Sequence, residues 1–115
     1  MTITKIDLTQ RLKGKVAVIT GAGFGRGMSR GFPEGFAREG ADLSLNIYQD
    51  DPERIAAFVK ELEVHGVRVI VTIGDISDEG VVARLVDNTL KAFGRVDILL
   101  NCAGITNPMS ITEMT

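Results

Sequence analysis

Glycines recur at every second position directly after an apolar run, a composition typical of a phosphate-binding turn. Residues 16–20 read VAVIT, and Gly21, Gly23, Gly25 and Gly27 follow. Glycine permits positive φ values and a close approach of backbone N–H groups to a ligand. A helix that begins after such a turn adds a partial positive charge that favours a phosphate. The alternative is a glycine loop that binds nothing.

Other residues that could carry chemistry are few. His65 is the only histidine, and we interpret it as a surface residue at the end of a helix. Cys102 is the only cysteine, which excludes a disulfide framework and indicates a small buried residue. No cluster of His, Cys or Asp has the spacing of a metal site, and no Walker-type phosphate motif occurs.

The composition predicts a globular domain without a nucleic-acid or membrane partner. Of the 115 residues, 44% are hydrophobic, and the net charge is −2 without a basic run. The apolar runs are too short to span a bilayer, and residues 1–15 lack the apolar core of a signal peptide. We therefore expect a single domain over residues 1–115, located in the cytoplasm.

Apolar runs alternate with amphipathic segments along the whole chain. The runs predict strands at 16–20, 42–47, 67–73 and 96–101. The amphipathic segments predict helices at 28–39, 52–64 and 78–93. Near-continuous apolar strands joined by helices indicate an α/β fold whose parallel sheet is covered on both faces. Right-handed crossovers then predict a doubly wound, three-layer sandwich of the Rossmann-like type.

Helix ends are marked by residues with clear capping chemistry. Gly40 and Gly94 follow the first and third helices and are expected to end them, and Ser77 is the expected N-cap of the third. The inner face of the third helix is predicted to consist of Val82, Leu85, Val86, Thr89, Leu90 and Phe93.

Four landmarks resemble one family, the short-chain dehydrogenase/reductases. Residues 20–27 resemble its TGxxxGxG turn, and Asp75-Ile76-Ser77 resembles its aspartate signature after the third strand. Asn101-Cys102-Ala103-Gly104 resembles its NNAG motif, and residues 93–99 resemble the segment that leads into that motif. The resemblance implies a strand order of 3-2-1-4 and an NAD(P)-dependent oxidoreductase that moves a hydride between the nicotinamide and an alcohol or ketone.

The resemblance also implies how the cofactor is held. The glycine turn would bind the pyrophosphate, Asp75 and the Ile76 N–H would bind the adenine, and Ala103 and Gly104 would pass the ribose. Asn101 would tie the fourth strand to its neighbours. The full implied cofactor-binding set is Gly21, Gly25, Arg26, Gly27, Met28, Ile47, Asp75, Ile76, Asn101, Ala103 and Gly104.

The sequence departs from the family pattern in the glycine segment. Counted from residues 36–41, the segment is about two residues longer than the family motif, and Ser29 then stands where a glycine is expected. Pro33 costs on the order of 3 kcal/mol inside a helix. A helix that begins near Phe32 would place Pro33 in its first turn and avoid that cost.

Cofactor choice is expected to depend on the end of the second strand. NAD-preferring sites carry an acid there for the ribose 2′-hydroxyl, whereas this chain has Ile47. Arg26 could pair with a 2′-phosphate or could be a solvated loop charge. Together the two residues predict a mild preference for NADP.

The family's catalytic Tyr-x-x-x-Lys pair does not occur in these 115 residues. Tyr48 is the only tyrosine, and the residue four positions later is Pro52. No catalytic residue is therefore assigned, and the chain resembles the N-terminal half of a longer reductase. The alternatives are a non-catalytic dinucleotide-binding module or an inactive fragment. A methyltransferase-like site is disfavoured because Thr20 and Ile47 stand where acids are usual.

The last predicted strand has a consequence for association. Ile98, Leu99 and Leu100 would lie on an edge strand, since the strand order 3-2-1-4 places that strand last in the sheet. Exposed apolar edge strands promote pairing between chains. We therefore expect self-association through this edge.

Overall fold

The computed structural model describes residues 10–23 and 28–102, with the side chains of residues 28 and 29 excepted. Its strands are β1 (Val16–Ala22), β2 (Asp42–Ile47), β3 (Val69–Ile73) and β4 (Ile98–Asn101). Its helices are α1 (Met28–Arg38), α2 (Pro52–Glu63) and α3 (Glu79–Phe93). Strands and helices alternate in the predicted order, and β2 has the predicted bounds.

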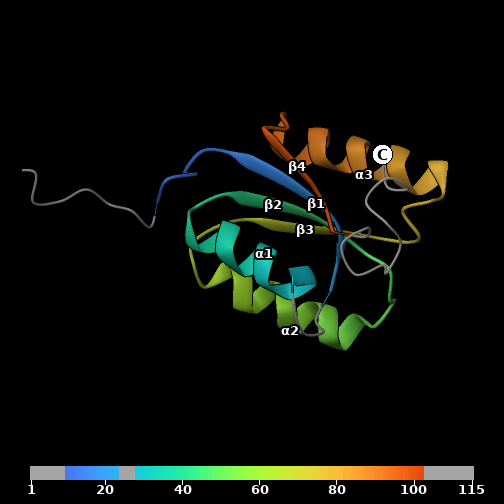
Figure 1. The fold of residues 1–115 in the computed structure, drawn as a ribbon, viewed down its shortest axis with the longest axis horizontal. Coiled ribbons are helices and arrows are strands. Elements are labelled where there is room, and N and C mark those ends of the chain that lie inside the picture. Colours follow the sequence, from blue (N-terminus) through green and yellow to red (C-terminus); the bar gives the residue numbers. More distant parts are fainter. Residues whose placement is uncertain (1–9, 24–27, 103–115) are drawn as a thin grey trace, which may run out of the picture.

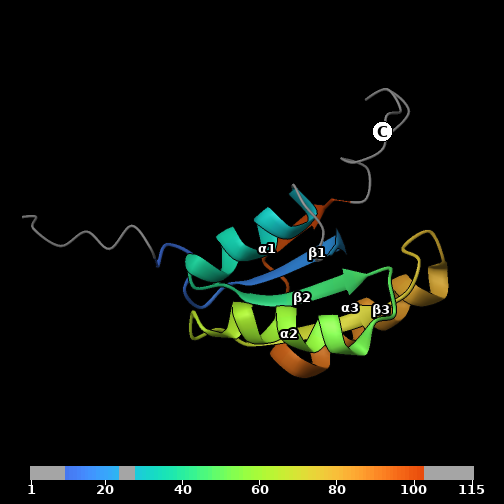
Figure 2. The same cartoon turned by 90° about the horizontal axis from the view of Figure 1, so that it is seen from below.

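The strands form one parallel sheet in the order β3-β2-β1-β4. Helices α1 and α2 cover one face of the sheet, and α3 covers the other (Figures 1 and 2). This arrangement confirms the doubly wound, three-layer, Rossmann-like fold. Among the helices in the described part of the chain, none has the length and apolar character needed to cross a membrane.

The face of the sheet toward α1 and α2 carries the main hydrophobic core. Alternate residues of the strands point to this face because side chains in a strand alternate. They pack without solvent exposure against Phe58 and Leu62 of α2 and against Ala37 of α1. The strand residues of this core are Ala17, Ile19, Leu43, Leu45 and Ile47.

Two glycine caps end their helices as predicted. Gly40 has a φ of 94°; its N–H donates to Ala37 O, and the next N–H, of Ala41, donates to Phe36 O. This pair of bonds is a Schellman motif. Gly94 caps α3 in the left-handed conformation, and its N–H donates to Leu90 O.

The N-cap predicted for the third helix was wrong. Asp78, and not Ser77, caps α3, because the Asp78 side chain accepts a hydrogen bond from the Gly80 N–H at 2.8 Å. Ser77 instead donates to Asp75 in the preceding turn. Helix α1 begins at Met28, as predicted, and not near Phe32, so Pro33 lies in its second turn. The Pro33 ring is fully buried there.

Three strand bounds differ from those predicted. β1 extends to Ala22, two residues beyond the apolar run, while β3 and β4 begin at Val69 and Ile98, two residues late. Both late starts follow segments that carry ionic contacts. Arg68 pairs with Asp42, and Arg95 pairs with Asp97.

Candidate functional site

The carboxyl ends of all four strands meet at one edge of the sheet, because the strands are parallel. This edge holds Gly21 of β1, Ile47 of β2 and Asn101 of β4, and β3 leads directly into Asp75 and Ile76. Ligands of open α/β sheets bind outside the carboxyl ends of the strands, where the strand order changes direction. The change of direction here lies between β1 and β4.

A bulge in β1 shapes the start of the glycine turn. Ile19 pairs with Leu45 of β2, and the next pair joins Ala22 to Ile47, so β1 advances three residues while β2 advances two. Gly21 lies in this bulge with a φ of 67°, a conformation that favours glycine. We call residues 20–23 the Gly21 turn.

A buried asparagine holds the Gly21 turn against the sheet. The Gly21 N–H donates to Oδ1 of Asn46 at 3.1 Å. The Asn46 Nδ2 donates to the carbonyls of Thr72, at 3.3 Å, and Gly74, at 2.9 Å. Three hydrogen bonds of one side chain therefore join the ends of three strands. Asn46 is 1% exposed, so these bonds are shielded from solvent.

Sequence reasoning did not single out Asn46. The signal was present, since Ser44 and Asn46 are polar residues two apart in the otherwise apolar strand 42–47. A spacing of two places them on the same face. Both are buried and hydrogen-bonded on the α3 side, where Ser44 Oγ contacts Thr89 Oγ1 at 2.6 Å.

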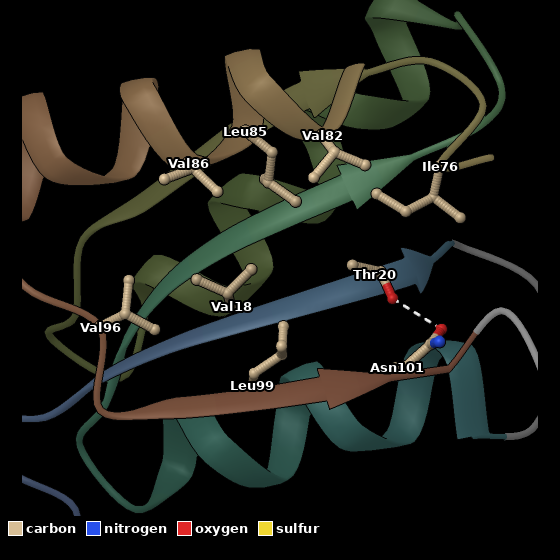
Figure 3. A pocket seen from close by; sticks show the side chains of 9 residues that line it. All are labelled: Val18, Thr20, Ile76, Val82, Leu85, Val86, Val96, Leu99 and Asn101. Carbon is tan, nitrogen blue, oxygen red and sulfur yellow. Dashed lines mark hydrogen bonds between the residues drawn. The ribbon is translucent and has the colours of Figure 1, made fainter. Parts of the chain in front are cut away.

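Asn101 ties β4 to β1, as the resemblance implied. The Thr20 hydroxyl donates to Asn101 Oδ1 at 2.8 Å, and Figure 3 shows this bond at the carboxyl end of both strands. Thr20 and Asn101 also pair as backbone neighbours in the ladder. The side-chain bond therefore fixes the seam where the strand order changes direction.

Asp75 is exposed and pre-organised in the turn after β3. Its Oδ1 accepts from the Ser77 N–H at 2.9 Å and from the Ser77 hydroxyl at 2.8 Å. These bonds, with the backbone N–H first, lower the pKa of the Asp75 carboxyl below its ordinary value. The carboxylate is therefore charged at neutral pH, and its other oxygen, Oδ2, can accept from a ligand donor. Ile76 beside it is half-buried.

At the end of β2 the predicted site residue, Ile47, is buried, and the next residue, Tyr48, faces the solvent instead. Ile47 is 1% exposed and packs in the core, whereas Tyr48 is 67% exposed. The Ile47 carbonyl accepts from the Gly74 N–H at 3.1 Å, which joins β2 to the turn after β3. No acidic side chain stands at the last position of β2, in agreement with the sequence.

An apolar groove runs along the α3 side of β1 and β4. Its volume is about 230 Å³, and Figure 3 shows Ile76, Thr20 and Asn101 at one end of it. The rest of its lining is apolar and comprises Val18, Val82, Leu85, Val86, Val96 and Leu99. The groove thus adjoins the edge that carries the predicted ligand residues.

The inner face predicted for the third helix was wrong in part. Val81, Leu85 and Thr89 are the buried residues of α3. Val82, Val86 and Leu90, which we expected inside, are each two-fifths exposed or more. Residues within each row are four apart, and the two rows are offset by one residue, so sequence periodicity does not separate them.

Several predicted site residues lie outside the described part of the chain. These are Gly25, Arg26, Gly27, Ala103 and Gly104. Met28 begins helix α1, whose N-terminus follows the glycine segment as predicted. The structure therefore brings Gly21, Asp75, Ile76 and Asn101 to one edge.

The family model of the short chain dehydrogenases matches residues 15–115. The chain belongs to this family. The chain is similar to General stress protein 39 of Bacillus subtilis, with 39% identity over 108 residues, which are 91% of this chain and 36% of that protein. It is 34% identical over 104 residues to the dehydrogenase subunit BbsD of Thauera aromatica, over 90% of this chain and 40% of that protein.

A solved structure supports the same assignment. The short chain dehydrogenase from Mycobacterium paratuberculosis, bound to NAD, superposes with a TM-score of 0.71 at 29% identity. The match covers 91% of this chain and 42% of that protein. The chain thus spans about two-fifths of the length of these three proteins.

Proposed function

We propose that this chain is the dinucleotide-binding part of an NAD(P)-dependent oxidoreductase of the short-chain type. The observation that carries the proposal is the convergence at one edge of the Gly21 turn, the start of α1 and the charged Asp75. In the full-length protein the substrate would be an alcohol or a ketone. The bound nicotinamide would supply or accept the hydride.

Each part of the edge suits one part of the cofactor. The Gly21 turn leads toward the N-terminus of an 11-residue helix, where backbone N–H groups and the helix dipole favour the pyrophosphate. We assign Gly25, Arg26, Gly27 and Met28 to the same role. Asp75 Oδ2 would accept from the adenine amino group.

The remaining assignments complete the adenosine end of the site. The Ile76 N–H would contact the adenine beside Asp75, and Ala103 and Gly104 would pass the ribose. Asn101 acts through Thr20 by fixing the seam between β4 and β1. Ile47 would contribute through its backbone, since its side chain is buried.

We propose a mild preference for NADP over NAD. It is supported by the buried, uncharged Ile47 at the end of β2, where an acid would repel a 2′-phosphate. Arg26 would supply the positive charge. Separate titrations with NADPH and NADH test this preference directly, and tighter binding of NADH would contradict it.

A second candidate function is a dinucleotide-binding module without turnover. It is supported by the same edge, since the Gly21 turn and the charged Asp75 serve binding and no hydride-transfer residue is among them. Both candidates predict that the chain binds the cofactor. They differ in whether bound NADPH is oxidised when ketones are added.

The test of cofactor binding is titration calorimetry of this chain with NADPH. We expect saturable binding that weakens by about 10- to 100-fold in Asp75→Ala, because a hydrogen bond to a charged acceptor is lost. Ser77→Ala is the matched control, since it removes one of the bonds to Asp75 and keeps the carboxylate. Equal affinity of Asp75→Ala and the wild type would refute the role of Asp75.

We also propose that the chain self-associates through β4. In the described part of the sheet β4 is an edge strand, and Leu99 is 70% exposed. A strand edge is complementary to the same edge of a second copy related by two-fold symmetry. Leu99→Lys should shift the sedimentation profile toward monomer, and a wild type that is monomeric at all concentrations would contradict the proposal.

A cytoplasmic location is proposed as well. It is supported by the cysteine usage of the sequence, since the single cysteine, Cys102, carries a free thiol and disulfides are rare in the cytosol. Fractionation of the source cells would check the location.

A further inference from the structure

We propose that Asn46 is a positioning residue that sets the entrance of the cofactor site by binding the Gly21 amide. The inference rests on the proposed dinucleotide site and adds a residue that does not touch the ligand. It assigns the Gly21 N–H to the sheet and not to the pyrophosphate. The remaining N–H groups of the glycine segment would then serve the ligand.

The bulge in β1 creates the need for such a residue. An extra residue in one strand leaves a backbone group without its partner in the ladder. Gly21 is half-buried, and an N–H that is shielded from water without an acceptor is costly, so an acceptor must be supplied locally. Asn46 lies in β2 between Leu45 and Ile47, the two residues that pair on either side of the bulge. Its Oδ1 is the acceptor of the Gly21 N–H.

The other half of the Asn46 amide fixes its orientation. Nδ2 faces two carbonyl oxygens, those of Thr72 and Gly74, so a flipped amide would place Oδ1 against both acceptors. Only the observed orientation satisfies all three bonds. Because the side chain is 1% exposed, water is not at hand to replace any of them.

The position of Asn46 links the two sides of the proposed site. Its Oδ1 holds the turn proposed for the pyrophosphate, and its Nδ2 holds Gly74 O, directly before the proposed adenine residue Asp75. The distance between the two ends of the cofactor site therefore depends on this amide together with the backbone bond from the Gly74 N–H to the Ile47 carbonyl. Without the Asn46 bonds, the pyrophosphate contacts and the adenine contacts would both be present, but their spacing would not match the cofactor.

Ser44 provides a control for a purely structural role. It lies two residues earlier on the same strand and face, is also buried, and bonds Thr89 of α3. Ser44→Ala removes a buried hydrogen bond without contact to the Gly21 turn. Asn46→Ser removes the reach to Gly21 and keeps a small polar side chain.

The experiment has two readouts, and the first needs no cofactor. Hydrogen exchange of the Gly21 amide, followed by NMR, should be slow in the wild type and in Ser44→Ala and faster in Asn46→Ser. The second readout is NADPH affinity by calorimetry. We expect about tenfold weaker binding in Asn46→Ser and unchanged binding in Ser44→Ala.

The outcomes separate this inference from the proposed function. Rapid exchange of the Gly21 amide in the wild type would overturn the role of Asn46, even if Asn46→Ser did not fold. Equal losses of affinity in Asn46→Ser and Ser44→Ala would also overturn it, because both would then report general stability. If the wild type binds neither NADPH nor NADH, the proposed function fails. Faster exchange of the Gly21 amide in Asn46→Ser, and not in Ser44→Ala, would still support the role of Asn46 in holding that amide.

Discussion

The two faces of the sheet are built from different chemistry. The face toward α1 and α2 is apolar along every strand, and the residues of β1 and β2 on it are fully buried. The face toward α3 carries polar residues on each strand, and it opens into a groove beside β4. These polar residues are Thr20, Ser44, Asn46, Thr72 and Asn101.

The two faces contribute differently: the apolar face stabilises the sheet, and the polar face positions the residues at its edge. Burial of apolar surface has no direction, so the α1/α2 face can hold the sheet together without specifying positions at its edge. Hydrogen bonds are directional, and on the α3 face they join the strands near their carboxyl ends. No buried side-chain nitrogen or oxygen in the described residues is left without a partner. The buried polar groups of this face therefore all have hydrogen-bond partners, although the face is partly open.

The largest effect is expected from the apolar face. Leu45→Ala removes a fully buried side chain of β2 and should lower the free energy of unfolding by about 2 to 5 kcal/mol. Val86→Ala, on the open side of α3, should change it by less than about 1 kcal/mol. Urea unfolding followed by circular dichroism measures both. Similar losses in the two variants would show that the faces do not differ as described.

The next largest effect is expected at Gly74, in the turn that follows β3. A Cβ on Gly74 would lie 2.6 Å from Val81 Cγ2, and the φ of 144° disfavours any side chain. Gly74→Ala should therefore cost roughly 1 to 3 kcal/mol. Gly35→Ala in α1 is the control, because its Cβ meets nothing within 4 Å and alanine favours a helix. Thermal unfolding that shifts Gly35→Ala downward as far as Gly74→Ala would contradict this reading.

The smallest effect concerns pH at the seam between β1 and β4. Asp97 accepts from Arg95 at 2.6 Å and from the Val16 N–H at 2.8 Å, and these bonds lower its pKa, the Arg95 bond most. A lowered pKa in the folded state means that the stabilisation is present above the ordinary carboxyl pKa of about 3.9 and is lost as pH falls below it.

Asp97→Asn should therefore be less stable than the wild type at pH 7, and the gap should narrow at pH 3. Urea midpoints at the two pH values measure the gap. Asp87→Asn, whose side chain pairs only with Lys91 on the exposed surface of α3 among the contacts described, serves as the matched control. A gap for Asp97→Asn that stays constant with pH would exclude this contribution.

Most of the fold could be predicted because its signals are local. The alternation of apolar runs and amphipathic segments led to the correct order of elements and the three layers. Gly40 and Gly94 were correctly predicted as caps because a left-handed residue after a helix favours glycine wherever the helix lies. The candidate edge followed from the same logic, since residues after parallel strands share one end of a sheet.

Other features were decided by tertiary contacts. Asp78 and Ser77 have equal capping chemistry in the sequence, and the path of the turn after β3 gives the cap to Asp78. Val81 and Val82 are adjacent and equally apolar, yet Val81 is buried, whereas Val82 is 40% exposed. In each pair the residue types allow both outcomes, and the packing of distant segments selects one.

The sequence by itself determined the parallel sheet, its helical layers and the glycine turn, because periodicity and backbone preferences act over a few residues. Only the tertiary structure decided that Asn46 of β2 binds Gly21 of β1 and Gly74 after β3, since those bonds span 25 and 28 residues of chain. A hydrogen bond between segments so far apart depends on strand register. The bulge that sets this register is a property of the paired strands and not of either one alone.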